Sequence, residues 1–359
     1  MKDSKALAKI KLSLQKLPIS KNTYYWFILP AVIIFIALVC GSVYTGNNQY
    51  DGFANIGIDF RGGTVLTVQM DGAEMLGGNR EANLELITEV VERNGALVSS
   101  DQDSGSNTLI VRYPNSIEVD GIRSDYNSAE RTEEMIAINR KIAEEVVSAF
   151  KAKYGDSVEV RANPEMINAT ASENLIQKAL LSVGIAMLLM LIYIAFRFDF
   201  FSGLAALCAQ LHDVIIMLSL VIIFRIQINS SLIAGIITIV AYSINNTIVI
   251  FDRVRENMAP YKHKDKSKLD FGYIIDTSVT ESLTRALFTS FTTLITIIVL
   301  AAWGVQSLTN FALPIIFGIL AGLYSSIFLA PSIWGLIMNA RRNKQRKAKK
   351  AAAMRGRRR

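Results

Sequence analysis

The stretch Ala241-Tyr-Ser-Ile-Asn-Asn-Thr-Ile-Val-Ile-Phe-Asp-Arg-Val-Arg-Glu-Asn-Met258 carries two adjacent asparagines in an apolar run that passes directly into charge. No residue from Ile226 to Phe251 is charged, and this run is longer than the ~20 residues that a helix needs to cross a bilayer. The stretch therefore predicts the end of a membrane helix. Because a polar side chain is costly in lipid, we expect Asn245 or Asn246 to face other helices or a water-filled cavity.

Hydrophobic residues make up 51% of the 359-residue chain and are gathered into long blocks, which is typical of a polytopic membrane protein. The formal net charge of +7 alone would favour a nucleic-acid partner. However, the basic residues lie mainly in two arms, residues 1–24 and 341–359. Basic residues that flank membrane spans set orientation, so we expect no nucleic-acid partner.

Six membrane spans are predicted. Residues 25–44 form the first, which we interpret as an uncleaved anchor because it is long for a signal peptide and no small-x-small cleavage pattern follows. Residues 176–340 hold five more, at 179–196, 200–224 and 226–251 and in the uncharged segment 286–340, which a polar stretch at 303–310 splits in two.

The charges on either side of the spans predict their orientation. The loop at residues 252–285 carries seven Lys and Arg and is expected inside by the positive-inside rule. Residues 45–175 hold 22 acidic and 11 basic residues, a balance opposite to that of the arms, and are expected outside. Both termini would then be cytoplasmic in a multi-pass protein of the cytoplasmic membrane.

The acidic block at residues 45–175 has the patterns of a folded domain. Alternation predicts strands at 64–70, 108–113 and 157–162, and amphipathic patterns predict helices at 80–94 and 128–154, ended by Gly95 and Gly155. We expect an α+β sandwich with the helices on one face of a small antiparallel sheet.

Asp213 lies near the middle of the third span, next to His212. An ionised carboxylate there costs about 2.5–3.5 kcal/mol, and intramembrane ionisable residues are by default functional. We therefore favour an ion-coupling role over the alternative, a structural pair in which Asp213 bonds His212 or a hydroxyl on a neighbouring helix. Asn246 is better explained as an interhelical hydrogen bond of about 0.6 kcal/mol than as a ligand for Na⁺ through its carbonyl oxygen.

Charged residues continue past the fourth span and precede the fifth. Solvated pairs such as Asp252 with Arg255 and Arg253 with Glu256 explain the first group without catalysis. Arg285 begins the fifth span, where it either snorkels, pairs with Glu281 one turn earlier, or takes part in ion coupling. The last two alternatives stay equally open.

Three motifs resemble a known family. They are Gly57-Ile-Asp-Phe-Arg-Gly-Gly-Thr64, Leu211-His-Asp-Val214 and Ser243-Ile-Asn-Asn-Thr-Ile-Val-Ile-Phe-Asp-Arg-Val-Arg-Glu-Asn257. In order and spacing the chain is similar to the SecF family, the smaller half of the SecD/SecF unit of bacterial protein export. The motif residues with structural or coupling roles in this resemblance are Gly57, Asp59, Phe60, Gly62, Gly63, His212, Asn245, Asp252, Arg253, Arg255, Glu256 and Asn257.

The resemblance implies a fold and a function. The fold would be of the RND (resistance-nodulation-division) superfamily, a polytopic α-helical membrane protein with six transmembrane helices and one α+β extracytoplasmic domain between helices 1 and 2. The function would be to promote polypeptide export across the bacterial cytoplasmic membrane with the proton or sodium gradient. SecD, the SecY channel complex and the exported polypeptide would be the partners.

One position departs from the family pattern. Most relatives have Asp at the position of Asn246, and that Asp is thought to pair with an Arg early in the fifth span, here Arg285. Asparagine cannot titrate, so Asp213 becomes the best carboxylate that this chain offers. The candidates for ion coupling are therefore Asp213, Asn246, Arg285 and Glu281.

We expect no enzyme activity, metal or cofactor, because the sequence has no Cys/His cluster and no nucleophile elbow. Gly62 and Gly63 precede a strand and lack the Lys-Ser/Thr of a P-loop, so they are interpreted as a backbone device that turns the chain into the outer sheet. The alternatives are a non-energised scaffold subunit and a small-molecule RND-type exporter. The basic tail favours membrane lipid as a further partner, at about 1 kcal/mol per residue near an anionic surface.

Overall fold

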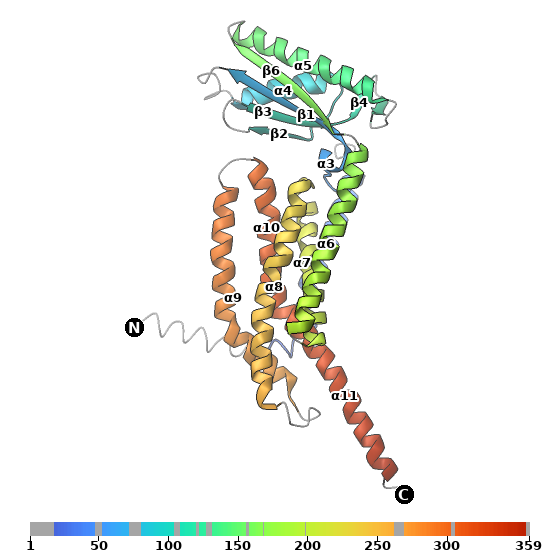
Figure 1. The fold of residues 1–359 in the computed structure, drawn as a ribbon, viewed down its shortest axis with the longest axis vertical. Coiled ribbons are helices and arrows are strands. Elements are labelled where there is room, and N and C mark those ends of the chain that lie inside the picture. The colour runs from blue at the N-terminus through green and yellow to red at the C-terminus, as the bar shows by residue number, and fades with distance from the viewer. Residues whose placement is uncertain are drawn as a thin grey trace, which may run out of the picture.

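The computed structural model describes residues 18–46, 52–71, 80–103, 108–119, 122–126, 131–155, 158–167, 169–197, 199–261, 269–302 and 306–356. The chain forms a bundle of long helices with an α+β domain at one end (Figure 1). A single long helix, the end of α11, extends from the opposite end of the bundle.

Among the described residues, six helical segments are long and apolar enough to cross a membrane, as the sequence predicts. The helices are α2 (Ile28–Thr45, after the 3₁₀ turn Tyr25–Phe27), α6 (Ala169–Arg197), α7 (Phe200–Ile223), α8 (Ser230–Met258), α9 (Phe271–Ala301) and α10 (Gln306–Tyr324), which continues through the π turn Ser325–Leu329 into α11 (Ala330–Gly356).

Two helices run further than hydropathy predicts. α9 begins at Phe271, well before residue 286, because Asp270 Oδ1 accepts hydrogen bonds from the first backbone N–H groups, 3.0 Å from Gly272 N. The expected loop at 252–285 is therefore largely helical, and the linker-like residues 262–268 lie outside the described residues. α11 continues to Gly356 because the basic tail is rich in Ala, Lys and Arg, which are strong helix formers.

α8 lies at the centre of the bundle and packs against α7, α9 and α10. Gly318 on α10 allows α10 to approach α8 closely, because a Cβ atom on this residue would lie 2.5 Å from Ile239 Cγ1. In contrast, the membrane span of α6 is not buried in this chain, and residues such as Leu181 and Leu188 are exposed. Exposed apolar faces of this kind fit contact with lipid or with another membrane subunit.

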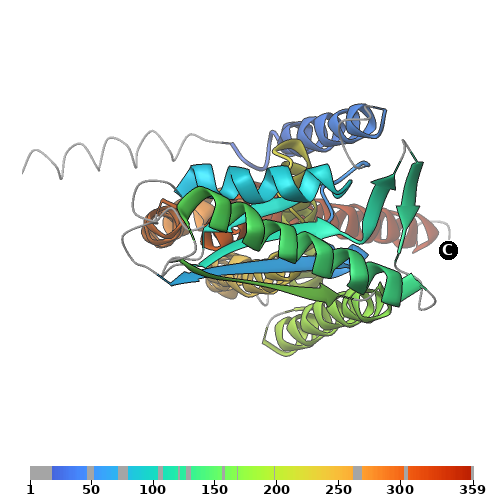
Figure 2. The ribbon, with the colours of Figure 1, turned by 90° about the horizontal axis from the view of Figure 1, so that it is seen from above.

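The α+β domain holds a four-stranded antiparallel sheet in the order β2-β3-β1-β6. The strands are β1 (Gly63–Asp71), β2 (Ser100–Asp103), β3 (Thr108–Pro114) and β6 (Glu159–Ile167), with a separate hairpin of β4 (Ser116–Val119) and β5 (Ile122–Asp125). The helices α4 (Arg80–Arg93) and α5 (Thr132–Tyr154) lie over one face of the sheet, as Figure 2 shows. Alternate side chains of β1 and β3, among them Leu66 and Val111, form the core beneath them.

The sequence predicts β1, β3, β6, α4 and α5 and their antiparallel arrangement. Gly95 (φ 82°) and Gly155 (φ 85°) end the two helices in the left-handed region, as expected. The four-residue strands β2, β4 and β5 escape prediction because they are too short to show a period. The start predicted for α5 at residue 128 differs from the observed Thr132, and residues 127–130 lie outside the described residues.

Candidate ion-coupling site

Asp213 lies in the interior of the bundle, with its side chain fully buried. Its Oδ1 is 2.9 Å from Nδ1 of His212, and its Oδ2 accepts a hydrogen bond from the Ser243 hydroxyl on α8. Ser325, in the π turn after α10, lies beside this carboxyl group, and its hydroxyl donates a 3.3 Å hydrogen bond to Gly322 O. Three segments of the bundle therefore meet at one carboxyl group.

The backbone of α10 closes the site. A Cβ built on Gly322 would lie 3.0 Å from the Ser243 side chain and 3.5 Å from Asp213 Oδ2. A larger residue would force the Ser243 side chain to shift by a few tenths of an ångström and so would disturb the Asp213–Ser243 hydrogen bond. The adjoining π turn (Ser325–Leu329) is a feature that often occurs at functional positions in helices.

His212 connects Asp213 to the outside of this cluster. Its Nε2 is buried and has no hydrogen-bond partner among the described residues. The ring also borders an apolar cavity of about 220 Å³ between α2, α7 and α10. Both structural partners predicted for Asp213 are present, namely His212 and a hydroxyl group on a neighbouring helix. The same two groups are also able to exchange a proton with the Asp213 carboxyl group.

Asn246 is buried one helical turn after Ser243, and its Nδ2 donates a 3.0 Å hydrogen bond to Ser290 Oγ on α9. This is the interhelical hydrogen bond predicted for it. Asn245, by contrast, is exposed on α8, so of the two asparagines only Asn246 faces the other helices.

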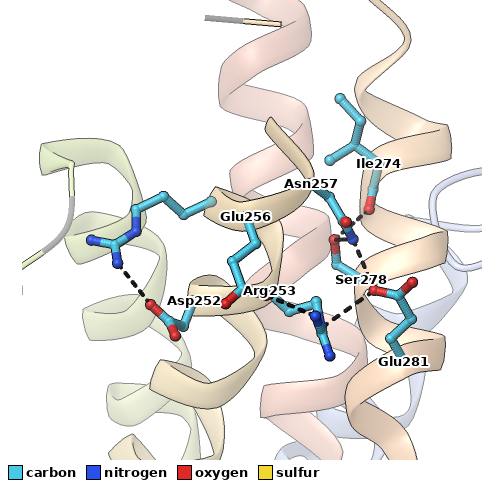
Figure 3. A network of polar contacts seen from close by, with 8 residues as sticks. Asp252, Arg253, Glu256, Asn257, Ile274, Ser278 and Glu281 are labelled. Atoms are coloured by element: carbon cyan, nitrogen blue, oxygen red, sulfur yellow. Dashed lines mark hydrogen bonds and ion pairs between the residues drawn. The ribbon is translucent and has the colours of Figure 1, made fainter. Parts of the chain in front are cut away.

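Of the alternatives open for Arg285, the pair with Glu281 does not form in the structure. Glu281 Oε2 instead lies 3.3 Å from Arg253 Nε and accepts a 3.1 Å hydrogen bond from Asn257 Nδ2 (Figure 3). α8 runs past the membrane span beside α9, and this brings Arg253 alongside Glu281. Arg285 is exposed and has no ion pair with any described residue, and Asn246 donates its hydrogen bond to Ser290 instead.

The other charges after the fourth span form the local pairs that the sequence predicts. Arg253 NH1 lies 2.7 Å from Glu256 Oε2, and Arg255 NH2 lies 3.1 Å from Asp252 Oδ1. Asn257 also donates to Ser278 Oγ at 3.0 Å, which fixes the end of α8 to α9 (Figure 3).

The glycine-rich motif joins the α+β domain to the bundle. In α3 (Ile58–Arg61), Asp59 Oδ2 accepts hydrogen bonds from both N and Oγ of Ser230, the first residue of α8. Gly57 N donates a 2.8 Å hydrogen bond to Ile228 O, and a Cβ on Gly57 would lie tightly against the same oxygen, at 3.0 Å. The half-buried Phe60 lies in the same short helix.

The glycine pair then turns the chain into β1. Gly62 has φ 79°, and a Cβ on Gly63 would lie 2.6 Å from Tyr113 O. Both positions therefore require glycine, which agrees with the backbone role predicted for the pair.

Sequence reasoning missed several residues of the site. Ser243 lies in the stretch 241–258, where the two asparagines are the more conspicuous polar residues, and Ser290, Ser325 and Gly322 lie in distant segments. The available signal was the presence of polar or small residues in apolar spans, which mark helix contacts in membranes. For Ser230 no local signal distinguishes a partner of Asp59 from an ordinary first residue of a helix.

Comparison with known proteins identifies the family. Residues 146–340 match the family described as "Protein export membrane protein SecD/SecF, C-terminal", and residues 55–74 match the "SecD/SecF GG Motif". The chain belongs to the SecD/SecF family. The SecD/SecF matches thus include the glycine-rich motif together with α6 to α10 and the beginning of α11.

Individual relatives agree. The chain is 34% identical over 290 residues to the protein translocase subunit SecF of Rickettsia akari, with 80% of this chain and 84% of that protein covered. It is 29% identical to the SecF of Helicobacter pylori strain J99 over 311 residues, covering 86% and 83%. The match to the SecDF of Bacillus subtilis is 29% identical over 89% of this chain but only 38% of that protein.

A solved structure of similar fold is that of SecDF, a translocon-associated membrane protein from Thermus thermophilus. The TM-score is 0.61 at 27% identity, over 90% of this chain and 38% of that chain. The predicted fold class, six membrane helices of RND type with one α+β domain between the first and second, is confirmed. This chain is a membrane subunit of a protein export family and spans well under half of the SecDF proteins.

Proposed function

We propose that this chain uses the proton or sodium gradient to promote polypeptide export across the cytoplasmic membrane. The observation that carries the proposal is the fully buried Asp213, whose carboxyl group joins α7, α8 and the π turn. An ion that crosses the membrane supplies about 2.3 kcal/mol per charge per 100 mV, enough to rearrange a few hydrogen bonds of this kind.

A change of charge at Asp213 alters its contacts with its neighbours. The ionised carboxylate accepts from Ser243, whereas a protonated carboxyl group also donates and requires a different arrangement of hydroxyl groups. His212 lies between the carboxyl group and the apolar cavity at α2, so it is the natural group to pass a proton on. Sodium would instead bind the carboxylate and hydroxyl oxygens.

α8 would transmit such a change to the α+β domain. Ser243 lies in the middle of this helix, and Ser230 at its N-terminus is bound to Asp59 at the base of the domain. A shift of α8 along or about its axis therefore changes the position of the domain, in which we place the contact with exported polypeptide.

The remaining parts of the proposal rest on charge and on the relatives. The acidic domain lies outside, both termini are cytoplasmic, and the chain acts without enzyme activity, metal or cofactor. SecD is a partner, since the relatives named SecDF carry it together with a SecF part, and the SecY channel complex completes the assembly.

A non-energised scaffold subunit is the second candidate. Two observations favour it: both oxygens of Asp213 are already hydrogen-bonded, and Asn246 serves as an interhelical contact with Ser290. In that case the titrating group belongs to SecD.

Export from membrane vesicles that contain this chain and its SecD, with and without an imposed H⁺ or Na⁺ gradient, separates the two candidates. Asp213→Asn keeps the shape of the side chain but removes its charge. Asp276→Asn on α9 is the matched control, because this carboxyl group also accepts two hydrogen bonds but from a different partner, N and Oγ of Ser20. We expect gradient stimulation to disappear only in Asp213→Asn, with SecD association unchanged. Full stimulation in both variants, or none in the wild type, would support the scaffold.

A further inference from the structure

A second cavity lies at the end of the bundle opposite the α+β domain. It has a volume of about 360 Å³, within the range of about 300–1,000 Å³ of ligand pockets. The turn between α6 and α7, the end of α8, the start of α9 and the middle of α11 surround it. Its inner wall is aromatic, with Phe200, Phe201, Phe251, Phe271 and Trp334.

Three arginines line the same cavity: Arg255, Arg341 and Arg342. The Arg341 guanidinium lies 4.1 Å from the centre of the Phe201 ring and has no ion pair with any described residue. Arg342 donates to Leu269 O at 2.8 Å and Arg255 pairs with Asp252, so these two are held in place.

The acidic residue in the wall does not neutralise these arginines. Asp199 accepts hydrogen bonds from Phe201 N, at 3.2 Å, and from Ser202 Oγ, and so caps the first turn of α7. Its oxygens are directed to the helix terminus, and its single charge faces Arg341 and Arg342, while Asp252 already pairs with Arg255.

The three arginines indicate the class of ligand that the cavity would take. A guanidinium group binds phosphate oxygens in pairs, so three arginines beside one cavity suit a phosphate group.

The position of the cavity in the membrane indicates which kind of phosphate-bearing molecule it would bind. Phe200 begins a membrane helix, and Arg341 is the first charged residue after the uncharged segment 286–340, so the cavity lies at the depth where lipid headgroups meet acyl chains. Aromatic side chains offer nothing to a free phosphate ion but fit the first carbons of an acyl chain.

We propose that this cavity binds one anionic phospholipid, with its phosphate at Arg341, Arg342 and Arg255 and its glycerol and proximal acyl carbons against the aromatic wall. The site is independent of Asp213. It would anchor the start of the exposed part of α11 to the membrane surface.

Fluorescence quenching in nanodiscs tests this proposal on the full-length protein. The lipid probes are phosphatidylglycerol and phosphatidylcholine brominated near the headgroup, and the signal of Trp334 is the difference between the wild type and Trp334→Phe. We expect half-quenching by the anionic lipid at a roughly tenfold lower mole fraction than by the zwitterionic lipid, the ratio typical of one charge-assisted contact.

Variants on α11 identify the charge that matters. Arg341→Ala should abolish the preference for phosphatidylglycerol, Arg341→Lys should keep part of it, and Lys347→Ala, an equal loss of charge on the same helix outside the cavity, should leave it unchanged. Arg341 makes no hydrogen bond with another described residue, so its loss does not threaten folding. Equal quenching by both lipids, or an equal effect of Lys347→Ala, would overturn the proposal.

Inorganic phosphate is the third probe. At millimolar concentration it should not relieve the quenching by brominated phosphatidylglycerol, because it lacks acyl carbons. Relief by phosphate would show a site for a soluble anion and contradict the assignment to lipid.

Discussion

Asp59 and Ser230 join the two halves of the molecule: Asp59 Oδ2 accepts hydrogen bonds from N and Oγ of Ser230, at 2.9 and 2.7 Å. Asp59 lies where the chain enters the α+β domain, and Ser230 is the first residue of α8. The same helix carries Ser243, which donates to Asp213. The buried carboxyl group and the base of the domain are thus connected through one continuous helix.

Asp59→Ala should weaken the connection between the α+β domain and the start of α8. Loss of a helix-capping carboxylate costs about 0.5–2 kcal/mol, and here the variant also frees the domain from α8. Spin labels on the domain and on the bundle should show a broader distance distribution by double electron–electron resonance. Asn229→Ala is the matched control, since Asn229 Oδ1 caps the same helix by accepting from Leu232 N, a bond within α8 and not to Asp59. Equal broadening in both variants would contradict the role of Asp59.

Gly318→Ala should destabilise the bundle. The added methyl group would lie 2.5 Å from Ile239 Cγ1, and overpacking of a tight core typically costs about 1–3 kcal/mol. We expect a lower Tm in detergent. Gly184→Ala is the control, because nothing lies within 4 Å of its Cβ and alanine is the better helix former by roughly 0.5–1 kcal/mol. A fall in Tm for both variants would show that the α8–α10 contact is not the cause.

Much of this fold follows from the sequence. Long uncharged runs predict the membrane helices, and Gly95 and Gly155 mark where two helices end. The sequence places the start of α9 too late, at residue 286, because hydropathy detects only apolar runs and the first turns of this helix are polar. Asp270 caps these first turns. The small strands β2, β4 and β5 depend on neighbours distant in the chain, so their four residues alone carry too little pattern.

Asn246→Ala should weaken packing but leave ion coupling intact. It removes the hydrogen bond to Ser290, worth about 0.6 kcal/mol in a membrane, and no titrating group. Gradient-stimulated export should persist in this variant and in Arg285→Ala, whose side chain is exposed. Asn246→Asp should not change the ion dependence either. Loss of stimulation in Asn246→Ala at normal protein level would place the coupling at that position.

Because of Tyr113, the stability of the α+β domain should change with pH in the alkaline range. Its hydroxyl donates to Asn139 Oδ1 at 2.9 Å, and burial raises the pKa of Tyr113 above its ordinary value of 10.0. Above about pH 10 the folded state keeps a proton that the unfolded state loses, so stability falls as pH rises. Below that pH, Tyr113→Phe should cost about 1–3 kcal/mol, because it leaves Asn139 without its donor.

Urea-dependent pulse proteolysis of the full-length chain measures this effect. The stability difference between the wild type and Tyr113→Phe should be largest near neutral pH and should narrow between about pH 9 and about pH 11, as the linkage requires. A difference that stays constant over this range would contradict the account. The sequence marks Tyr113 as a strand residue, but not as the donor to a helix 26 positions later.

For the candidate site, the sequence predicts the centre but not its surroundings. Asp213 stands out because an acid in an apolar span is rare. Its partner Ser243 lies 30 positions away, and Ser325 lies in the π turn between α10 and α11. Only the packing of the helices therefore brings these residues to Asp213. The sequence could not decide between the alternatives for Arg285 for the same reason, because the partner that Glu281 finds, Arg253, comes from a neighbouring helix.

The most direct test of the central claim is whether the Asp213 carboxyl group changes its protonation when a gradient is imposed. Difference infrared spectra of membranes that contain the chain and its SecD would be recorded for the wild type, Asp213→Asn and Asp276→Asn. The account predicts a change in a carboxylic-acid C=O band that is present in the wild type and in Asp276→Asn and absent from Asp213→Asn. Identical difference spectra in all three would contradict it and place the titrating group in the partner.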